Sequence, residues 1–450
     1  MRGLLLALLL LATPAFARPG QKPKPIPSAP SYAERVALVK KGKLPGFFEP
    51  NDLTKPPVLS APSALLLDYD TGEVLFESEA DSRHFPASTT KILTALLFIE
   101  NTKPDDIVVC TDPTVVKIEP STLSIKPGER FRAEQLLYGF ILRSANDGGV
   151  VIAEHVAGSV ASFARKMNER AAALGATNSH FVNPHGLHDP NHYTTARDLG
   201  MIARAAMQNP RFSDAVGTPR RTINRSINFK DIVVSSKAKG KFYDKVLGAD
   251  GIKTGYTRAA GHCFVGSVTR GGRRLIAVIL AAPSNAIGDT TPLLEWGFRR
   301  FSAKTVTVQG HSVGFVPVQS GSVDQVAVRS ATTFHVPIDT LHPGTIQTRI
   351  ESTKLTAPIV ANQEVGRLLV LRDGKPVGSI ALQAARGVPH LAASAKMRRP
   401  LPWLIVAGGA GVLFLIRYRH GHPFTPGNAR TPHPSPKSNR RRRNRVPPTS

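Results

Sequence analysis

The stretch Ser88-Thr89-Thr90-Lys91 runs directly into the apolar segment 92–99, and this junction constrains the fold more than any other part of the chain. The apolar segment predicts a buried helix that begins near the serine. Residues three apart lie on one face of a helix, so Lys91 would stand beside the Ser88 hydroxyl and could take its proton. The pattern suggests acyl transfer through a covalent serine intermediate. Taken alone, it is more commonly a serine N-cap followed by a surface lysine, so the rest of the chain has to decide.

The first 17 residues have the pattern of a secretory signal peptide. Arg2 precedes an apolar run at 3–12, and Ala15-Phe16-Ala17 forms a small-x-small cleavage site. We expect the mature chain to begin near Arg18 and to work outside the cytoplasm. Residues 18–57, which open with a stretch rich in Pro, Lys and Gly, are predicted to form an N-terminal linker.

The segment 58–300 is predicted to form an α+β domain in which a mixed sheet is covered by helices. Strands are expected at 63–69, 73–77 and 275–281, and helices at 134–142, 150–156, 160–173 and 293–300. Short alternating segments rich in Val, Thr, Ser and Gly follow at 301–390 and predict a small all-β domain. We find no catalytic cluster in this second domain.

Residues 391–400 read as a short basic linker, and residues 401–416 are uncharged and almost wholly apolar. A helix of this length spans about 24 Å, and Arg399 and Arg417 flank it, so we predict a transmembrane helix. A buried core helix is the alternative, but no soluble domain follows that could bury it.

The C-terminal tail, residues 417–450, carries nine Lys or Arg residues and no Asp or Glu, within a chain of net charge +26. We predict that it is disordered and that it lies in the cytoplasm, by the positive-inside rule. Contact with anionic lipid of the inner leaflet is expected, and a solvated tail is the alternative. Nucleic acid would suit the charge but is not expected as a partner.

Two further motifs follow the serine and lysine along the chain. Ser144-Ala145-Asn146 could relay a proton and hold a substrate amide from a tight loop, although a plain turn is the commoner interpretation. In Lys253-Thr254-Gly255 the glycine removes the Cβ where a substrate could lie along a strand edge. The lysine and threonine offer a cation and a hydroxyl to a carboxylate. A strand with a turn at its glycine is the alternative.

In order and spacing, the three motifs resemble the three marks of penicillin-binding proteins and serine β-lactamases. Their flanks resemble D-alanyl-D-alanine carboxypeptidases, at 85–91, 126–129, 134–139, 183–187, 193–199 and 251–257. The resemblance covers roughly Pro62 to Phe298 and extends more faintly into 357–370. It implies a β-lactamase/transpeptidase-like fold, peptidoglycan stem peptides ending in D-Ala-D-Ala as substrate, and β-lactams as inhibitors.

The resemblance also implies roles for the catalytic residues. Ser88 would attack the peptide carbonyl and become acylated, with Lys91 as its base. Ser144 and Lys253 would assist proton transfer to the leaving D-alanine, and Asn146 would hold the peptide amide. Water would then release the shortened peptide.

For substrate binding the resemblance implies Lys253, Thr254, Gly255 and Tyr256. Lys253 and Thr254 would bind the terminal carboxylate. The backbone N–H groups of Ser88 and Tyr256 would form the oxyanion hole, which needs two donors aimed at the developing charge.

A lysine base needs a lowered pKa, and burial together with a nearby cation lowers it. We predict that Lys91 is neutral in the resting enzyme because desolvation and the charge of Lys253 act together.

No cofactor and no metal are expected, and no nucleotide-binding glycine pattern occurs. Four histidines fall in a stretch whose Asn-Pro and Asp-Pro steps favour a turn-rich loop over a zinc site: His180, His185, His188 and His192. An exported chain permits one disulfide between Cys110 and Cys263, but a buried free thiol is the default for Cys263.

The leading interpretation is a membrane-anchored serine D-Ala-D-Ala carboxypeptidase whose catalytic domain lies outside the cell membrane. A D,D-endopeptidase acting on cross-links would use the same site. A β-lactamase is disfavoured because no Glu-x-x-Leu-Asn element is found. A catalytically silent wall-binding protein is disfavoured by the intact Ser88, Lys91 and Lys253.

Overall fold

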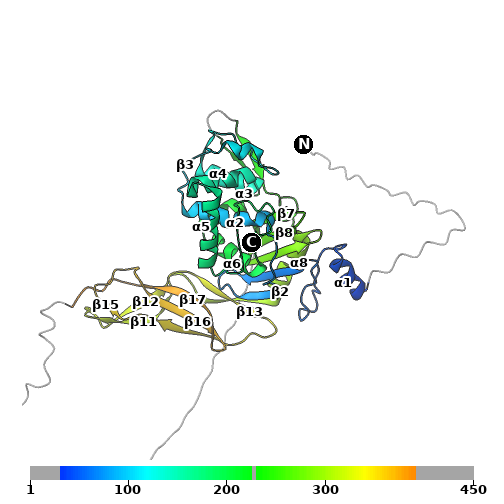
Figure 1. Cartoon of the computed structure of the whole chain (residues 1–450). Coiled ribbons are helices and arrows are strands. Elements are labelled where there is room, and N and C mark those ends of the chain that lie inside the picture. Colours follow the sequence, from blue (N-terminus) through cyan, green and yellow to red (C-terminus); the bar gives the residue numbers. More distant parts are fainter. Residues whose placement is uncertain (1–30, 226–229, 392–450) are drawn as a thin grey trace, which may run out of the picture. The chain divides into compact units, whose positions relative to one another are not determined.

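The computed structural model describes residues 31–225 and 230–391 (Figure 1). The predicted signal peptide, transmembrane helix and basic tail therefore lie outside the described residues, as does nearly all of the linker predicted at 391–400. Within the described ranges, no helix has both the length and the apolar character needed to cross a membrane.

A five-stranded antiparallel sheet forms the centre of the first domain, with strand order β2-β1-β9-β8-β7. Its strands are β1 (Ser63–Asp68), β2 (Val74–Ser78), β7 (Ala249–Thr257), β8 (Gly261–Arg270) and β9 (Arg273–Ala282). The predicted strands at 63–69, 73–77 and 275–281 are confirmed to within a few residues. The expectation of a mixed sheet is wrong. Short turns join β1 to β2, β7 to β8 and β8 to β9, and strands joined this way run antiparallel.

Helices cover both faces of the sheet, because side chains along a strand alternate between its faces. Leu65 and Leu67 of β1 belong to the core cluster that includes α2 and α6, whereas Ala64 and Leu66 belong to the cluster that includes α8. Helices α2 to α6 form one group in Figure 1. The helices of this domain are α2 (Lys91–Glu100), α3 (Ala133–Arg143), α4 (Asn146–Ala157), α5 (Val160–Ala173), α6 (Ala196–Met207), α7 (Pro210–Gly217) and α8 (Ala286–Arg300).

The predicted helices are confirmed, but α4 and α8 begin earlier than expected. Helix α4 starts at Asn146 rather than at Val150, so Asn146 stands in its first turn instead of in a loop. Small elements complete the domain: the 3₁₀ helices η1 (Ala87–Thr90) and η2 (Pro113–Lys117), and the strand pairs β3 (Ile107–Val109) with β4 (Arg130–Arg132) and β5 (Arg220–Ile223) with β6 (Ile232–Ser235).

The region predicted as an N-terminal linker, 18–57, is not a linker from residue 31 onward. It holds helix α1 (Tyr32–Lys40), which starts with a capping box between Ser31 and Glu34, and a bridge between Phe47 and Val58. Buried Asp289 of α8 fixes the stretch after α1. Its carboxylate accepts hydrogen bonds from the backbone N–H groups of Gly46, Ser60 and Ala61. The composition that predicts a linker, rich in Pro, Lys and Gly, is confined to 18–30, whereas the apolar residues Val39 and Phe47 that follow are buried.

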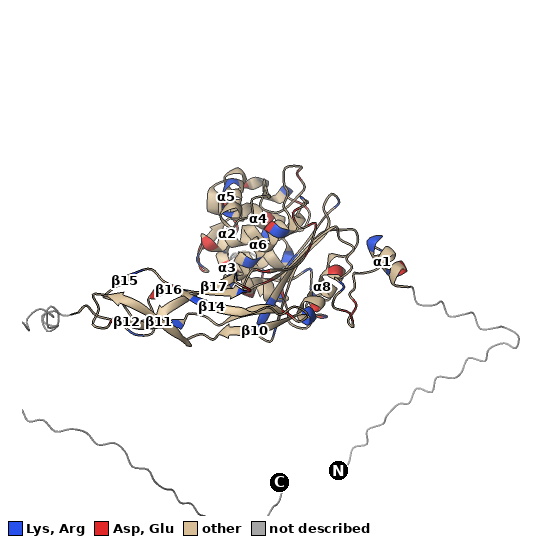
Figure 2. Ribbon diagram, turned by 90° about the horizontal axis from the view of Figure 1, so that it is seen from below, with Lys and Arg blue, Asp and Glu red and all other residues tan. Residues whose placement is uncertain are grey.

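The second domain is all-β, as predicted (Figure 2). Its six-stranded sheet has the order β14-β16-β17-β12-β11-β15, and β10 pairs with β13. A separate core of Val, Leu and Ile side chains fills it. The strands are β10 (Phe301–Thr307), β11 (Ser312–Gln319), β12 (Gln325–Ser330), β13 (Phe334–Asp339), β14 (Ile346–Glu351), β15 (Leu355–Thr356), β16 (Glu364–Arg372) and β17 (Lys375–Ala384).

Candidate active site

Ser88 and Lys91 lie at the junction of η1 and α2, as the sequence predicted. Ser88 is partly exposed, whereas Lys91 is completely buried by the helix group behind it. The Lys91 Nζ atom lies 3.1 Å from the Ser88 Oγ atom. A proton can pass between the two atoms without movement of the backbone.

Two oxygen atoms occupy the other hydrogen-bonding directions of the Lys91 amine. Its Nζ donates to Asn146 Oδ1 at 2.7 Å and to the backbone carbonyl of His185 at 2.6 Å. A neutral amine has two N–H donors and one lone pair. With both donors used, the lone pair faces the Ser88 hydroxyl, which can then donate to it.

The electrostatic surroundings favour this neutral form. Burial lowers the pKa of Lys91 well below its usual value, the charges of Lys253 and Lys237 lower it further, and Asp147 acts in the opposite direction. The direction and the two causes predicted from the sequence, desolvation and Lys253, are confirmed.

Ser144 and Lys253 form a second hydroxyl–amine pair. Ser144 ends α3 in the left-handed conformation, with φ 60°, and its Oγ accepts a hydrogen bond from Lys253 Nζ at 2.9 Å. Lys253 is 4% exposed, and burial followed by the charge of Lys237 lowers its pKa to about 7. Two amines with lowered pKa values therefore stand beside two serine hydroxyls.

Strand β7 is the last strand of the sheet order, and its Lys253-Thr254-Gly255-Tyr256 segment runs past η1. A Cβ atom added to Gly255 would lie 3.0 Å from Pro86 O and 3.0 Å from Ser88 N. The glycine thus lets the backbone of β7 approach Ser88 closely. The Tyr256 side chain is exposed, and its ring packs against His262 at a centroid distance of 4.6 Å.

A cleft of about 840 Å³ opens over these elements. Its walls include six of the eight predicted site residues, namely Ser88, Ser144, Asn146, Thr254, Gly255 and Tyr256. The other two, Lys91 and Lys253, lie directly behind Ser88 and Ser144. The structure therefore brings all eight together. Lys237, Lys241 and Lys245 add a basic wall that the sequence analysis did not single out.

A family model described as D-alanyl-D-alanine carboxypeptidase matches residues 51–284, and one described as penicillin-binding protein 5, C-terminal domain, matches residues 301–390. The chain belongs to the D-alanyl-D-alanine carboxypeptidase family. It is a serine-type peptidase with the penicillin-binding-protein fold and a C-terminal β domain.

Individual members of the family match both domains. The D-alanyl-D-alanine carboxypeptidase DacF of Bacillus subtilis is 31% identical over 325 residues, which are 70% of this chain and 82% of that protein. DacC of Escherichia coli is 32% identical over 352 residues, or 74% and 85% of the two chains. The crystal structure of penicillin binding protein 5 from Haemophilus influenzae aligns with a TM-score of 0.58 and 28% identity, over 75% of this chain and 99% of that one.

The family-like segment 183–187 contributes backbone carbonyls to the surroundings of Lys91, and its Gly186 and Leu187 line the cleft. The carbonyl of His185 accepts from Lys91, and the carbonyl of Pro184 accepts from Thr94 Oγ1 at 2.7 Å. Gly186 has φ +83°, and a Cβ atom there would lie 1.7 Å from the carbonyl oxygen of Ala87. The sequence showed this segment as a resemblance but gave no sign of what it does.

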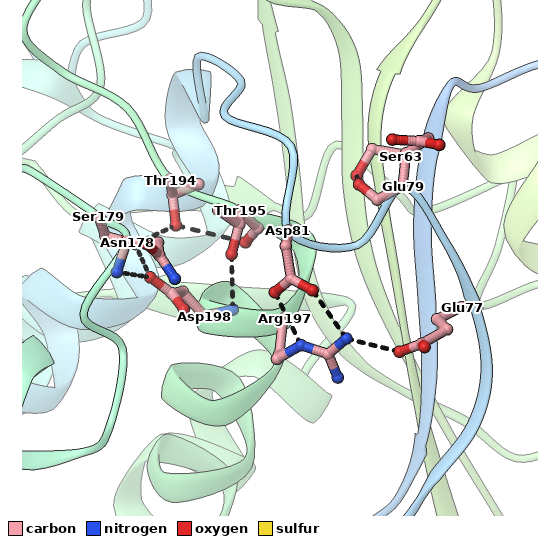
Figure 3. A network of polar contacts seen from close by, with 10 residues as sticks. All are labelled: Ser63, Glu77, Glu79, Asp81, Asn178, Ser179, Thr194, Thr195, Arg197 and Asp198. Atoms are coloured by element: carbon pink, nitrogen blue, oxygen red, sulfur yellow. Dashed lines mark hydrogen bonds and ion pairs between the residues drawn. The ribbon is translucent and has the colours of Figure 1, made fainter.

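The loop that carries this segment is held by partly buried polar contacts at its ends (Figure 3). The Asp198 Oδ2 atom accepts from the Asn178 N–H and the Ser179 hydroxyl, each at 2.7 Å. Ser179 also contacts Thr194 at 2.8 Å, and Thr195 caps α6 by accepting from the Asp198 N–H. Figure 3 also shows Arg197 reaching Glu77 and Asp81 near β2.

The cysteines and histidines take no metal-like arrangement in the described residues, where no group of three or more His, Cys, Asp or Glu side chains could hold a metal ion. Cys110 and Cys263 are buried free thiols. His192 is buried and hydrogen-bonded to Thr90 and to the Val182 N–H, and the His180 Nδ1–H donates to the Asn191 carbonyl at 2.6 Å.

Gly186→Ala is expected to abolish most penicillin labelling of the folded protein. The added Cβ would displace the Ala87 carbonyl, and with it the Ser88 backbone, so we expect a loss of more than about tenfold in acylation rate. Gly240→Ala is the matched control, because Gly240 has a similar φ of +77° but nothing within 4 Å of an added Cβ. Equal labelling rates in the two variants would show that the close approach at Gly186 does not matter.

Proposed function

We propose that the chain removes the terminal D-alanine from peptidoglycan stem peptides through an acyl-enzyme on Ser88. The observation that carries the proposal is the buried Lys91 amine, whose two donors are taken by Asn146 and His185 while its remaining direction faces Ser88. Family membership supports the substrate class, and the cleft over Ser88 is large enough for the end of a peptide.

In the acylation step, the Ser88 Oγ atom forms a bond to the carbonyl carbon of the penultimate D-alanine while its proton passes to Lys91 Nζ. The negative charge on the carbonyl oxygen is stabilised by the backbone N–H groups of Ser88 and Tyr256. The C–N bond then breaks, and the leaving amine takes a proton from the Lys91, Ser144 and Lys253 network. In the second step, a water molecule attacks the ester and returns Ser88 to its hydroxyl form.

The substrate's terminal carboxylate is assigned to Lys253 and Thr254. Lys253 supplies the charge and Thr254 lines the cleft. The basic wall of Lys237, Lys241 and Lys245 adds a field that attracts an anionic peptide, since no described carboxylate lies within ion-pair distance of these three amines.

A D,D-endopeptidase acting on cross-links, a β-lactamase and a silent wall-binding protein are the competing functions. The endopeptidase would use the same atoms on a bulkier substrate. The geometry around Ser88 weighs against a silent protein, because it leaves both hydroxyl–amine pairs intact.

We also propose that residues 1–17 are cleaved, that 401–416 span the membrane, and that the catalytic and β domains, 58–300 and 301–390, lie on its outer side. The sequence pattern at both termini supports this arrangement. The basic tail 417–450 would then lie on anionic lipid at the cytoplasmic face. A reporter enzyme fused after Arg445 should be active only inside the cell, and activity only outside would contradict the topology.

The function itself is tested by comparing the full-length protein in detergent with its Ser88→Ala variant. Labelled penicillin should acylate only the parent protein, and a pentapeptide ending in D-Ala-D-Ala should release D-alanine at a rate at least about 1,000-fold above that of the variant. Labelling that persists in the variant would exclude Ser88 as the nucleophile. Ser88-dependent labelling without D-alanine release would favour the endopeptidase or the silent protein.

The pH dependence of kcat/KM should be bell-shaped for a peptide with a free carboxylate. Below its lowered pKa Lys91 becomes protonated and cannot accept from Ser88, so the rate falls as the pH decreases. Lys253 is protonated below its pKa of about 7 and loses the charge that binds the carboxylate as the pH rises above it. Lys253→Arg keeps that charge at every pH and should therefore remove the basic limb, even if the substitution lowers the maximum value of kcat/KM. A basic limb that is unchanged in this variant would contradict the role of Lys253.

A further inference from the structure

His192 is a buried residue near the active site that takes no part in the mechanism above. It is 2% exposed, does not line the cleft, and packs edge-to-face against Phe181 at a centroid distance of 5.5 Å. Both of its ring nitrogens are hydrogen-bonded within the protein. These two hydrogen bonds connect Val182 of the loop to Thr90 of η1.

The partner of the Nδ1 atom decides which nitrogen carries the proton. The backbone N–H of Val182 lies 3.1 Å from Nδ1, and a backbone N–H can only donate, so Nδ1 is the acceptor. The proton of the neutral ring is therefore on Nε2. Burial is the main cause that lowers the pKa of His192 to about 4, which keeps the ring neutral at physiological pH.

The Nε2–H group donates to Thr90 Oγ1 at 2.8 Å, and the Thr90 hydroxyl donates in turn to the carbonyl oxygen of Ala87 at 2.9 Å. The chain of hydrogen bonds thus runs from the Val182 N–H through His192 and Thr90 to Ala87. Ala87 has φ +49°, a conformation that residues with a Cβ atom rarely adopt. It comes immediately before Ser88.

The carbonyl of Ala87 and the N–H of Ser88 belong to the same trans peptide group, so they point in opposite directions. Fixing the carbonyl against Thr90 therefore fixes the direction of the Ser88 N–H. Strand β7 passes close to the Ser88 N–H, as shown by the 3.0 Å between the Ser88 nitrogen and a Cβ atom added to Gly255. A hydrogen bond to the carbonyl also polarises the peptide group and makes its N–H a stronger donor.

We propose that His192 is a positioning residue of the oxyanion hole, which acts through Thr90 to hold the Ala87–Ser88 peptide group so that the Ser88 N–H faces the reacting carbonyl. The inference rests on the proposed function, in which that N–H stabilises the oxyanion. Without the His192–Thr90 link, Ala87 can relax toward a negative φ, and the peptide plane turns with it. The substrate still binds, but its developing charge loses an aligned donor.

Matched variants of the full-length protein distinguish an effect on the orientation of the Ser88 N–H from an effect on the stability of the fold. Thr90→Val and His192→Phe break the chain of hydrogen bonds with little change in volume, whereas Thr90→Ser and His192→Gln preserve a hydroxyl or an N–H donor at the same place. His192→Asn keeps an acceptor for Val182 but is too short to reach Thr90. His180→Gln, in the exposed part of the same loop, is the control.

Two constants are measured with labelled penicillin, counted per acylable site so that unfolded protein does not contribute. Thr90→Val, His192→Phe and His192→Asn should lower the acylation rate constant at saturation by about 10- to 100-fold. The dissociation constant before acylation should change by less than about threefold. The Ser and Gln variants should recover most of the rate, and the control should match the parent.

A rate per acylable site that stays within about twofold of the parent in Thr90→Val and His192→Asn would overturn the proposal and leave these residues a purely structural role. Ser88-dependent acylation of the parent would still stand in that case. If His192→Phe fails to fold, His192→Asn decides, because it retains the contact with Val182.

Discussion

The catalytic region is organised around a completely buried lysine amine that is held without a carboxylate partner. Burying a charged ammonium is costly, so the fold favours the neutral form of Lys91 and satisfies its two N–H groups with oxygen atoms of Asn146 and His185. This arrangement leaves a lone pair directed at Ser88. The two acceptors belong to α4 and to the loop at 178–195, and both of these pack against α2.

The backbone around Ser88 depends on the same loop. Ala87 stands at positive φ, and its carbonyl fits against Gly186 only because that residue has no Cβ. Asp198 and Arg197 hold the loop through buried and partly exposed contacts at its ends. The strained backbone at Ala87, next to Ser88, is thus supported by a region that is distant in sequence, which is how strained sites persist in stable folds.

Local patterns were sufficient to predict much of the fold from the sequence. The strand and helix positions followed from apolar periodicity, and the eight site residues followed from three motifs that resemble one family. The sheet direction, the helix at Tyr32–Lys40 and the contribution of His185 did not follow. The direction of the sheet and the helix at Tyr32–Lys40 depend on tertiary contacts such as those of Asp289. His185 contributes a backbone carbonyl, which every residue has, so the identity of the residue does not reveal this contribution. In the sequence, His192 is only one of four histidines in a predicted turn-rich loop, because its hydrogen-bond partners are far away in sequence.

The two active-site lysines are both buried, but they have different hydrogen-bond partners. Lys91 contacts Ser88, Asn146 and the His185 carbonyl, whereas Lys253 contacts Ser144. Burial lowers the pKa of both amines, that of Lys253 to about 7, and the charge of Lys253 adds to the effect of burial in holding the pKa of Lys91 well below its usual value. A protonated Lys253 therefore favours the neutral form of Lys91. In the proposed mechanism, a substrate carboxylate bound to Lys253 would stabilise its proton at the time when Lys91 acts as the free base. Binding of the carboxylate end of the peptide would thus support the neutral Lys91 that the proposed attack on the peptide carbonyl needs.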